Sequence, residues 1–381
     1  MRAYRPLVAF NAHLLAGDPS YRSAGISVYI ENLLRGLDRG DYGIRLEILL
    51  GGGILPPGVA APVRRSRFRT HRPVRRILWE QAILPSLLRD LEADLLHAPA
   101  FAGPLLTTCP QVITVHDLSF LRHPEFFRAG NRLYLQLITG MACRRAMAVI
   151  TVSHFGAQEV VSLLRVPNER VFTVYHGVAP RFRRLPREAV SEFRRARGLP
   201  DRFILFMGTL EPRKNLIRLI RAFDRLNDPE LHLILAGARG WFYEQIFAEV
   251  ERLGLNDRIH FPGYVAAETQ AFWYNAACAF AYVSVYEGFG MPVLEALACG
   301  VPAVTSSSTS LPEAGGPGVL MVSPEDETAI ADGLHRIVSE GSLRQQLAQD
   351  GLAYASGFSW EKTAEGTADV YRWVVARKGT K

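Results

Sequence analysis

The chain has 381 residues, of which 44 are lysine or arginine and 37 are aspartate or glutamate, so its formal net charge is +7. Its content of 48% hydrophobic and 21% charged residues excludes a disordered, collagen-like or coiled-coil protein. A single hydrophobic core stops growing at roughly 250–300 residues, so the length favours two domains.

Short apolar runs alternate with longer amphipathic runs, which is the pattern of βα units in parallel sheets and predicts an α/β fold. The first half has six predicted strands: Leu7–Ala12, Arg45–Leu50, Leu95–His97, Gln111–His116, Ala148–Val152 and Val171–Tyr175. It also has four helical patterns: Ile26–Leu37, Val74–Leu91, Asn131–Arg145 and His154–Leu164. Ser153 directly precedes the last of these and is predicted to be its N-cap.

Several features bear on where the protein acts. The apolar run near the N-terminus is short and contains Asn11 and His13, so it is interpreted as a first strand and not as a signal peptide. No segment reads as a membrane span. The four cysteines lie far apart and suit buried thiols in a reducing compartment. We therefore expect a cytoplasmic protein.

The positive charge is unevenly divided along the chain. Residues 1–190 contain 25 arginines, no lysine and 14 acidic residues, whereas acidic residues are in excess after residue 190. Seven of these arginines lie between Arg64 and Arg76, just before the amphipathic segment ILWEQAILPSLLRDL. This stretch is either a solvated loop or a contact for an anionic surface or acceptor. Nucleic acid is disfavoured as a partner, because aromatic residues are not interleaved with these arginines in the way that a base-stacking surface needs.

A basic, proline-containing stretch, APRFRRLPRE, follows Val178, and the alternation then restarts. Five further strands are predicted: Phe203–Met207, His232–Ala236, Ile259–Phe261, Ala279–Val283 and Ala303–Thr305. The helical runs of this half are Leu216–Arg225, Tyr243–Gly254, Glu268–Asn275, Pro292–Cys299, Asp326–Glu340, Ser342–Ala355 and a last one from Ser359. The prediction is two doubly wound sheets, with ligands bound in a cleft at the carboxyl ends of their strands.

The most informative motif is EGFGMPVLEALACGVPAVT, which runs from Glu287 to Thr305. Its glycine loop leads into a helix with Pro292 in the first turn, so unpaired N–H groups and the helix dipole would form a site for a diphosphate. Glu287 and Glu295 flank that site, and carboxylates accept strong hydrogen bonds from sugar hydroxyls. The alternative is that Glu287 is a surface acid and Glu295 a helix-dipole partner.

A second motif, FILFMGTLEPRKNL, presents Arg213 and Lys214 between a buried strand and a helix. Two cations there can neutralise a diphosphate, whereas a merely structural pair of cations would oppose the helix dipole. In the first half, His116 ends the strand ITVHD, and Gly25 opens the first helix, where backbone N–H groups could approach a phosphate. Either residue could equally be structural.

Other chemistries lack their motifs. No complete G-x-G-x-x-G follows the first strand and no G-x-x-x-x-G-K-[ST] occurs, which argues against a nicotinamide or flavin enzyme and a P-loop ATPase. No histidine cluster or D-x-D pair has the spacing of metal ligands. We expect neither a metal nor a cofactor.

With these residues identified, the sequence resembles the retaining glycosyltransferases of family 4, which have the GT-B fold of two Rossmann-like parallel-sheet domains facing across a cleft. The resemblance extends over nearly the whole chain and is carried by GTLEPRKN and EGFGMPVLEALACGVP. The final FSW and the helix that follows it resemble the family's segment that returns to the first domain. The resemblance implies an acceptor-side domain of residues 1–182 joined by 360–381, and a donor domain of residues 183–359.

The resemblance also implies roles for individual residues. Glu287, the first acid of the family's hallmark pair, would hold hydroxyls of the donor sugar, and Glu295, the second, would hold the ribose. Lys214 matches the family's diphosphate lysine. The arginine usual after the strand glycine is replaced by Thr209, which leaves Arg213 as the second cation.

His116 matches a family histidine near the reacting sugar, and Gly25 matches a phosphate-contacting glycine. Gly263 and Tyr264 lie where the family's backbone contacts the nucleobase. The remaining donor-contacting positions implied by the resemblance are Gly208, Gly288, Phe289, Gly290 and Met291.

The implied activity is retaining, metal-independent transfer of a hexose from a nucleotide diphosphate sugar. Similarity of the two motifs to bacterial mannosyltransferases of cell-surface polysaccharides suggests GDP-mannose as the donor. The acceptor would be a glycan or a lipid-diphosphate-linked glycan, with peripheral contact to the inner face of the cell membrane through Arg64–Arg76. Two alternatives remain open, namely a sugar-nucleotide epimerase or hydrolase of the same architecture and a non-catalytic nucleotide-sugar-binding protein.

Overall fold

The structure is a computed structural model that describes residues 4–15, 24–51, 53–66, 70, 73–126 and 129–378. The chain divides into two compact units. Unit 1 consists of Met1–Gly177 together with Ser359–Lys381, and unit 2 of Val178–Phe358.

The chain passes from unit 1 to unit 2 after Gly177, earlier than the boundary at Phe182 that the sequence indicated. The reason is that the intervening residues pack on unit 2. The Val178 N–H donates to the Phe358 carbonyl at 3.4 Å, and the buried ring of Phe182 lies edge-on to Tyr274 with centroids 5.8 Å apart. Gly177 itself leaves no room for a side chain, because a Cβ there would lie 2.1 Å from the Trp360 nitrogen.

Within the described residues, unit 1 is built on a seven-stranded sheet whose order is β3-β2-β1-β4-β5-β6-β7. All neighbouring strands are parallel; Val8, for example, is paired with Leu46 on one side and Leu95 on the other. The strands are β1 Leu7–Asn11, β2 Arg45–Leu50, β3 Val63–Arg65, β4 Leu95–Ala98, β5 Gln111–Val115, β6 Ala148–Thr151 and β7 Val171–Thr173.

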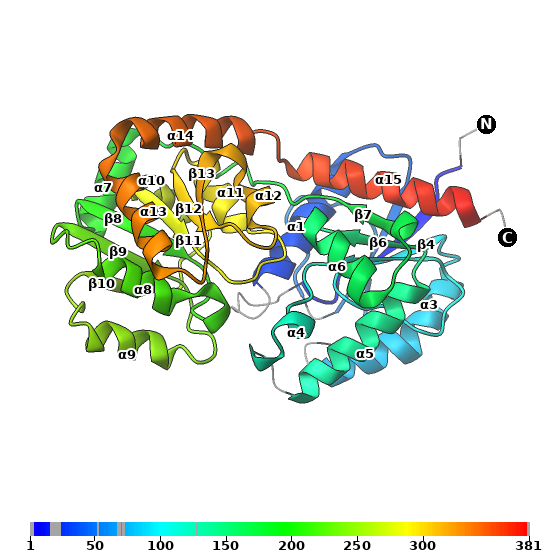
Figure 1. Cartoon of the computed structure of the whole chain (residues 1–381). Coiled ribbons are helices and arrows are strands. Elements are labelled where there is room, and N and C mark those ends of the chain that lie inside the picture. The colour runs from blue at the N-terminus through cyan, green and yellow to red at the C-terminus, as the bar shows by residue number, and fades with distance from the viewer. Residues whose placement is uncertain are drawn as a thin grey trace. The chain divides into compact units, whose positions relative to one another are not determined.

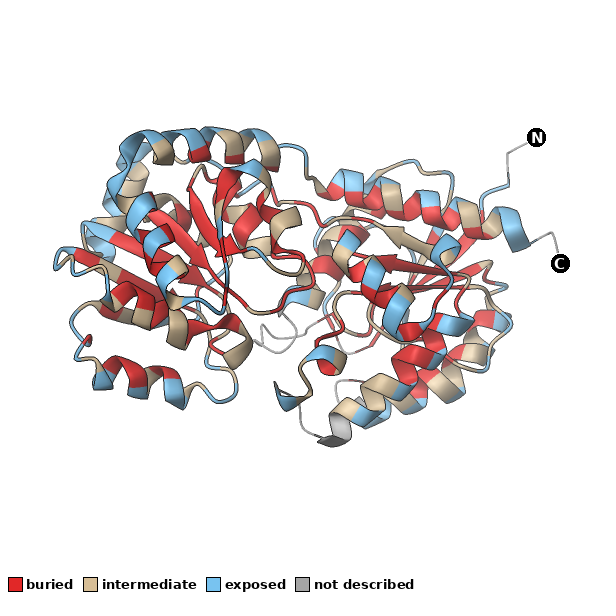
Figure 2. Cartoon of the chain, viewed as in Figure 1, coloured by how far each residue is buried: buried red, intermediate tan, exposed pale blue. Residues whose placement is uncertain are grey.

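Helices cover both faces of this sheet, with α1 and α15 on one face and α3, α5 and α6 on the other (Figure 1). The two helices of the first face are α1 Ala24–Arg39 and α15 Trp360–Lys378. The others are α2 Pro73–Leu78, η1 Trp79–Ile83, α3 Leu84–Asp90, α4 Ser119–Arg122, η2 Pro124–Phe126, α5 Ala129–Arg145, α6 His154–Leu164 and η3 Asn168–Arg170. The central strands β1, β4, β5 and β6 are buried, whereas the edge strands β3 and β7 are not, and the outer sides of the helices are exposed (Figure 2).

Unit 2 repeats the same topology with the order β10-β9-β8-β11-β12-β13, again with parallel neighbours. Its strands are β8 Arg202–Met207, β9 Leu231–Ala236, β10 Ile259–Gly263, β11 Ala279–Tyr282, β12 Ala303–Ser306 and β13 Val319–Val322. Its helices are α7 Arg187–Arg197, η4 Pro212–Lys214, α8 Leu216–Asp224, α9 Glu244–Arg252, α10 Gln270–Ala276, α11 Met291–Ala298, α12 Leu311–Gly315, η5 Gly316–Gly318, α13 Glu327–Ser339 and α14 Gly341–Ala355.

The prediction of two doubly wound parallel sheets is therefore confirmed, as is the N-cap Ser153, whose Oγ accepts from the Gly156 N–H at 3.0 Å. The continuous helix predicted over Val74–Leu91 is wrong in its middle, where η1 is a π-helical segment that ends just before Pro85. Proline has no N–H to continue the α-helical hydrogen bonds, which explains the change of pitch. In the part of the chain that the structure describes, no helix is both long enough and apolar enough to cross a membrane.

Candidate functional site

The predicted donor-binding residues of unit 2 lie at the carboxyl ends of its strands, around the point where the strand order reverses. Strand β8 has β9 on one side and β11 on the other, so the segments that leave β8 and β11 run to opposite sides. Such a switch point is the usual ligand site of a doubly wound sheet. Lys214 follows β8 and Glu287 follows β11, so both come from the two strands that flank this point.

Lys214 and Glu287 form a buried ion pair there, with Lys214 Nζ 2.5 Å from Glu287 Oε1. The ammonium group also donates to the hydroxyl of Tyr282, the last residue of β11, at 2.6 Å. Burial and the neighbouring Arg213 charge lower the pKa of Lys214. Burial alone would raise the pKa of Glu287, but the charges of Arg213 and Lys214 outweigh it and hold that pKa at about 2. Glu287 is therefore ionised at neutral pH.

Arg213 lies between two carboxylates. Its Nη1 donates to Glu287 Oε2 at 3.1 Å, and its Nη2 donates to Glu211 Oε1 at 2.9 Å. A further bond joins Nη1 to the Tyr286 carbonyl at 3.1 Å. The arginine thus lies in the same cluster as Lys214, with a guanidinium group fixed in direction by Glu211.

The glycine loop after Glu287 is fixed by two hydroxyls from the segment before α12. Ser310 Oγ lies 2.9 Å from the Glu287 carbonyl and 3.0 Å from the Phe289 carbonyl, and the Glu287 N–H donates to Thr309 Oγ1 at 3.3 Å. Gly290 has φ 111°, a conformation that few residues with a side chain adopt, and helix α11 starts at the next residue. The loop therefore places the N–H groups of Gly290 and Met291, at the helix start, at the sheet's carboxyl edge.

Glu295, on α11, has a different environment from Glu287. Its Oε2 accepts a hydrogen bond from the hydroxyl of the fully buried Tyr274 at 3.0 Å. Burial raises the pKa of Glu295 to about 7, despite that bond and the Arg181 charge. The structure thus brings Arg213, Lys214 and Glu287 into one cluster but gives Glu295 a partner of its own.

The ends of β8, β9 and β10 are joined through close backbone contacts. Gly237 follows β9, and a Cβ on this residue would lie 1.8 Å from the Gly208 carbonyl oxygen. The Gly237 N–H donates to the Gly263 carbonyl at 2.8 Å. Tyr264 is exposed beside Gly263. Thr209, which replaces the family arginine, lies against Gly240, where a Cβ would be 2.9 Å from its Cγ2.

In unit 1, His116 directly follows β5. Its Nε2 lies 2.8 Å from the Pro99 carbonyl. Because a carbonyl only accepts, Nε2 carries the proton and Nδ1 of the neutral ring is left as an acceptor. Burial lowers the pKa of His116. The edge of Tyr29 and the parallel ring of His176 hold the imidazole, with centroids 4.7 and 5.7 Å away.

Gly25 and the arginine stretch Arg64–Arg76 are the other two regions of unit 1 that were predicted to contact a ligand or partner. Gly25 lies at the start of α1 and is exposed, with open space where a Cβ would be. Of the arginine stretch, Arg67, Arg69 and Arg72 lie outside the described residues. Arg64 is paired with Glu47 at 2.8 Å.

Sequence reasoning missed several residues that shape these sites: Glu211, Tyr282, Thr309, Ser310, Tyr274 and His176. His176 follows a strand as His116 does, so the same signal could have found it. Over the described residues, no group of three or more His, Cys, Asp or Glu side chains has the geometry of a metal site. All four cysteines are free thiols; Cys143 and Cys299 are buried, while Cys109 and Cys278 are only half-buried.

Comparisons with known proteins identify the family. Residues 23–182 match the family described as Glycosyltransferase Family 4, and residues 190–353 match Glycosyl transferases group 1. O-antigen chain mannosyltransferase B of Escherichia coli is 34% identical over 289 residues, which are 75% of this chain and 76% of that protein. The serotype-specific mannosyltransferase WbdA of Escherichia coli is 32% identical over 277 residues, 70% of this chain but only 33% of WbdA.

Solved structures show the same fold. Sucrose-phosphate synthase from Thermosynechococcus elongatus has a TM-score of 0.78 at 20% identity, covering 98% of this chain and 100% of that one. HepE of Anabaena, in complex with UDP and glucose, has a TM-score of 0.74 at 18% identity, covering 97% of this chain and 100% of HepE. The fold is GT-B, and the chain belongs to the glycosyltransferases that combine a family 4 domain with a group 1 domain.

Proposed function

We propose that this protein is a retaining, metal-independent glycosyltransferase that transfers mannose from GDP-mannose to a glycan or lipid-linked glycan in cell-surface polysaccharide synthesis. The observation that carries the proposal is the buried cluster of Lys214, Arg213 and Glu287 at the switch point of unit 2. The mannosyltransferase relatives support mannose as the sugar, because they are named for that transfer. HepE, crystallised with UDP-glucose, supports a nucleotide sugar as the donor.

The cluster suits the chemistry of a glycosyl diphosphate. When the bond at the anomeric carbon breaks, negative charge grows on the leaving phosphate and positive charge grows on the sugar ring. Lys214 and Arg213 would stabilise the phosphate together with the N–H groups of Gly290 and Met291, as donors in an oxyanion hole do. Glu287 would then accept hydrogen bonds from hydroxyls of the sugar, and Glu295 from those of the ribose.

The acceptor proton has no dedicated base in this proposal. The leaving phosphate takes it on the same face of the sugar, which gives retention, and no residue of unit 2 serves as a covalent nucleophile. His116 would contact the donor sugar through its Nδ1 lone pair. The protein is proposed to act in the cytoplasm, with Arg64–Arg76 contacting an anionic acceptor or the inner membrane face.

The stereochemical part is tested by NMR of the product formed from GDP-α-mannose. We expect an α-linked product and unchanged turnover after treatment with EDTA. A β-linked product would contradict retention, and loss of turnover that Mg²⁺ or Mn²⁺ restores would contradict metal independence.

The donor is tested by thermal unfolding with GDP-, UDP- and ADP-sugars. A ligand at 100 times its Kd stabilises the folded state by about 2.7 kcal/mol, and we expect the GDP-sugars to give the largest shift. A larger shift with UDP- or ADP-sugars would change the donor but leave the glycosyltransferase assignment intact.

The two alternative functions are separated by the variant Glu287→Ala. It should abolish transfer while nucleotide binding persists, and the matched control Glu325→Ala, at an exposed acid of the same unit, should leave both intact. Donor consumption without any acceptor would favour an epimerase or hydrolase. A wild-type protein that binds nucleotide sugar but shows no turnover with any acceptor would favour a binding protein.

A further inference from the structure

Unit 1 has a pocket that the proposed reaction does not use. The pocket has a volume of about 740 Å³, a size typical of small-molecule sites. Gln111, the first residue of β5, lines it, whereas His116 directly follows the other end of that strand. Because β5 has five residues and a strand rises about 3.3 Å per residue, the two positions lie roughly 15 Å apart. The pocket therefore lies at the edge of the sheet opposite to the carboxyl edge, where such sheets bind their substrates.

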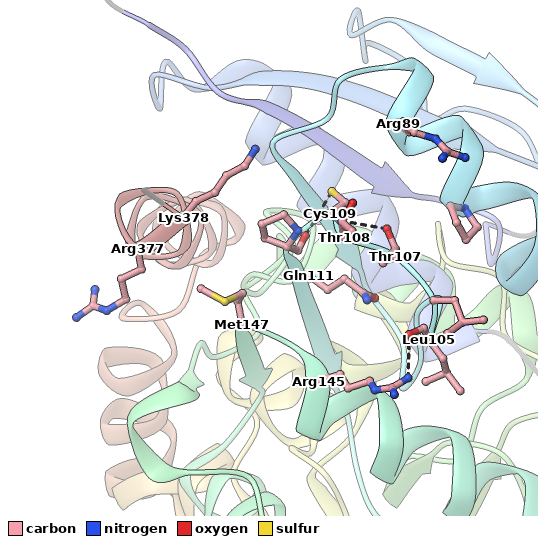
Figure 3. A pocket seen from close by; sticks show the side chains of 13 residues that line it. Arg89, Leu105, Thr107, Thr108, Cys109, Gln111, Arg145, Met147, Arg377 and Lys378 are labelled. Carbon is pink, nitrogen blue, oxygen red and sulfur yellow. Dashed lines mark hydrogen bonds between the residues drawn. The ribbon is translucent and has the colours of Figure 1, made fainter. Parts of the chain in front are cut away.

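The pocket is basic. Of the described residues that line it, none is acidic and four are cations at or near the ends of α3, α5 and α15, namely Arg89, Arg145, Arg377 and Lys378 (Figure 3). Lys378 is paired with Asp94 at 3.0 Å. The guanidinium carbon of Arg377 lies 4.0 Å from the centre of the Trp373 ring. These two cations of α15 therefore already have partners within unit 1.

Arg89 and Arg145 are the two cations that can take a ligand. Arg89 donates to Ser86 Oγ at 3.3 Å and Arg145 to the Leu105 carbonyl at 2.9 Å, and neither forms an ion pair with the acids that the structure describes. Each guanidinium group has five N–H donors, so most of them remain for an anion. A cation at a helix end also offsets the helix dipole, but that role does not require the arginines of two helices to line one pocket without an acid. The arrangement favours a phosphate, whose oxygens accept pairs of hydrogen bonds from arginine.

The rest of the lining suits a molecule with hydroxyl groups. Gln111 is only 6% exposed; its Nε2 donates to the Pro104 carbonyl at 2.8 Å, but its Oε1 has no hydrogen-bond partner among the described residues. A buried amide oxygen without a partner is rare in folded proteins. Thr107 and Thr108 add two hydroxyls from a loop that lies between Arg89 and Arg145 in the view of Figure 3. None of the described lining residues is aromatic, so the pocket suits a sugar phosphate better than a nucleotide, whose base needs a ring to stack on.

We propose that this pocket is a second ligand site, which binds a soluble sugar phosphate without reacting with it. Arg89 and Arg145 hold the phosphate, while the Gln111 amide and the two threonine hydroxyls bind hydroxyls of the sugar. All lining residues belong to unit 1, so the site is separate from the donor cluster of unit 2. The inference goes beyond the proposed function, which needs a donor and an acceptor but no third ligand.

Cys109 gives a readout of occupancy that does not depend on activity. Its half-buried thiol lines the pocket, and burial raises its pKa to about 12, so alkylation by N-ethylmaleimide is slow. Cys278, a half-buried thiol of unit 2 whose pKa burial also raises, is the internal reference. Mass spectrometry follows both thiols of the full chain with mannose 6-phosphate or with mannose. At ten times its Kd a ligand leaves about one pocket in eleven empty, so mannose 6-phosphate should slow labelling of Cys109 about tenfold and mannose should not.

The double variant Arg89→Gln/Arg145→Gln tests the phosphate contacts. It should raise the Kd for mannose 6-phosphate, measured by calorimetry, at least about tenfold, because the charge-assisted hydrogen bonds to the phosphate are lost. GDP binding and glycosyl transfer should stay as in the wild type. The matched control Arg165→Gln/Arg195→Gln removes two exposed arginines elsewhere and should bind mannose 6-phosphate normally.

Lys214→Met separates this site from phosphate bound at the donor cluster. Protection of Cys109 should persist in that variant, because Lys214 belongs to unit 2. Protection that is lost in Lys214→Met, that mannose gives equally, or that survives in Arg89→Gln/Arg145→Gln would overturn the proposal. So would protection by phosphatidylglycerol vesicles without any by mannose 6-phosphate, because the occupant would then be a lipid. Each of these results leaves GDP binding and transfer to be judged separately, so failure here is distinguishable from failure of the proposed function.

Discussion

The two units share one sheet topology but differ in the charge of the buried groups at the carboxyl edge. In unit 2 that edge holds an ion-paired network of Lys214, Arg213 and Glu287. In unit 1 the corresponding edge holds imidazoles whose burial lowers their pKa, to about 4 for His13 and in the same direction for His116 and His176. These histidines are neutral at pH 7.

The interior of unit 1 also contains a hydrogen-bonded chain of neutral polar side chains. His97 lies 2.5 Å from the Tyr371 hydroxyl through Nδ1 and 2.9 Å from Thr114 Oγ1 through Nε2, and Thr114 Oγ1 lies 3.1 Å from the Tyr29 hydroxyl. The chain of bonds thus links α15 to Tyr29, whose ring packs on His116. The comparison teaches that one topology can present charges suited to a diphosphate or neutral polar groups suited to hydroxyls, depending on which residues end its strands.

The largest expected effect is in the charged unit. Lys214→Met removes the cation nearest Glu287 while Arg213 keeps that carboxylate paired, and turnover should fall about 10²–10³-fold, as when one oxyanion donor is lost. Steady-state kinetics measure it, with thermal unfolding as the check on folding. The matched control Lys362→Met, at an exposed lysine, should be unaffected. If the turnover of the Lys214→Met enzyme is within tenfold of the wild type, the proposed functional difference between the two units is contradicted.

The second prediction concerns pH. The pKa of Glu295 is about 7 in the free protein, whereas a ribose that donates to its carboxylate favours the ionised form. Nucleotide binding should therefore release a proton below pH 7, and affinity should fall about tenfold for each pH unit below that value. Calorimetry in buffers of different ionisation enthalpy measures the release. Glu295→Gln should flatten the pH profile, and a wild-type profile that is already flat would mean that Glu295 does not meet the ribose.

The raised pKa of Glu295 also makes the stability of the folded state depend on pH. A carboxyl whose folded pKa is raised from 4.5 to about 7 favours the folded state at low pH, and this contribution is lost as pH rises through 7. Glu287 acts oppositely, because its pKa is lowered to about 2 and its contribution is lost as pH falls from 4.5 through 2.

The smallest effect is expected in the neutral unit. Tyr371→Phe leaves a ring nitrogen of the buried His97 without its partner, which should cost about 1–3 kcal/mol in the free energy of unfolding. Urea unfolding measures it, and nucleotide binding should be unchanged. Tyr4→Phe, which removes an exposed hydroxyl bonded to Asp94, is the control and should cost less. Equal losses for the two variants would argue against the buried chain of bonds as a stabilising element.

Most of the fold could be predicted from the sequence because long apolar strands and amphipathic helices dominate it. The exceptions are elements with weak signals. Strand β3, Val63–Arg65, is short and largely exposed, so it has no apolar run to detect. Strand β13, Val319–Val322, follows a glycine-rich segment that resembles a loop. Helix α7, Arg187–Arg197, was not predicted, because few of its residues are apolar and none is buried.

The candidate site was predictable in its residue types but not in its pairings. Lys214 and Glu287 are 73 positions apart, and only the parallel placement of β8 and β11 brings them together. The sequence indicated Arg213 as a second cation but could not show that Glu211, two positions earlier, would fix its direction. The contrast between Glu287 and Glu295 was also hidden, since pKa values depend on buried neighbours that motifs do not specify.

The chain leaves unit 1 after Gly177, where there is no room for a side chain, and this has a consequence for protein engineering. Unit 2 is a continuous insertion whose first and last residues, Val178 and Phe358, are hydrogen-bonded to each other, while unit 1 is assembled from two separate pieces of chain. Adjacent ends are the condition under which a domain can be excised, grafted or circularly permuted with a short linker. Exchange of residues 178–358 between relatives would therefore transfer the proposed donor site as one cassette, whereas unit 1 can be exchanged only if its closing helix moves with it.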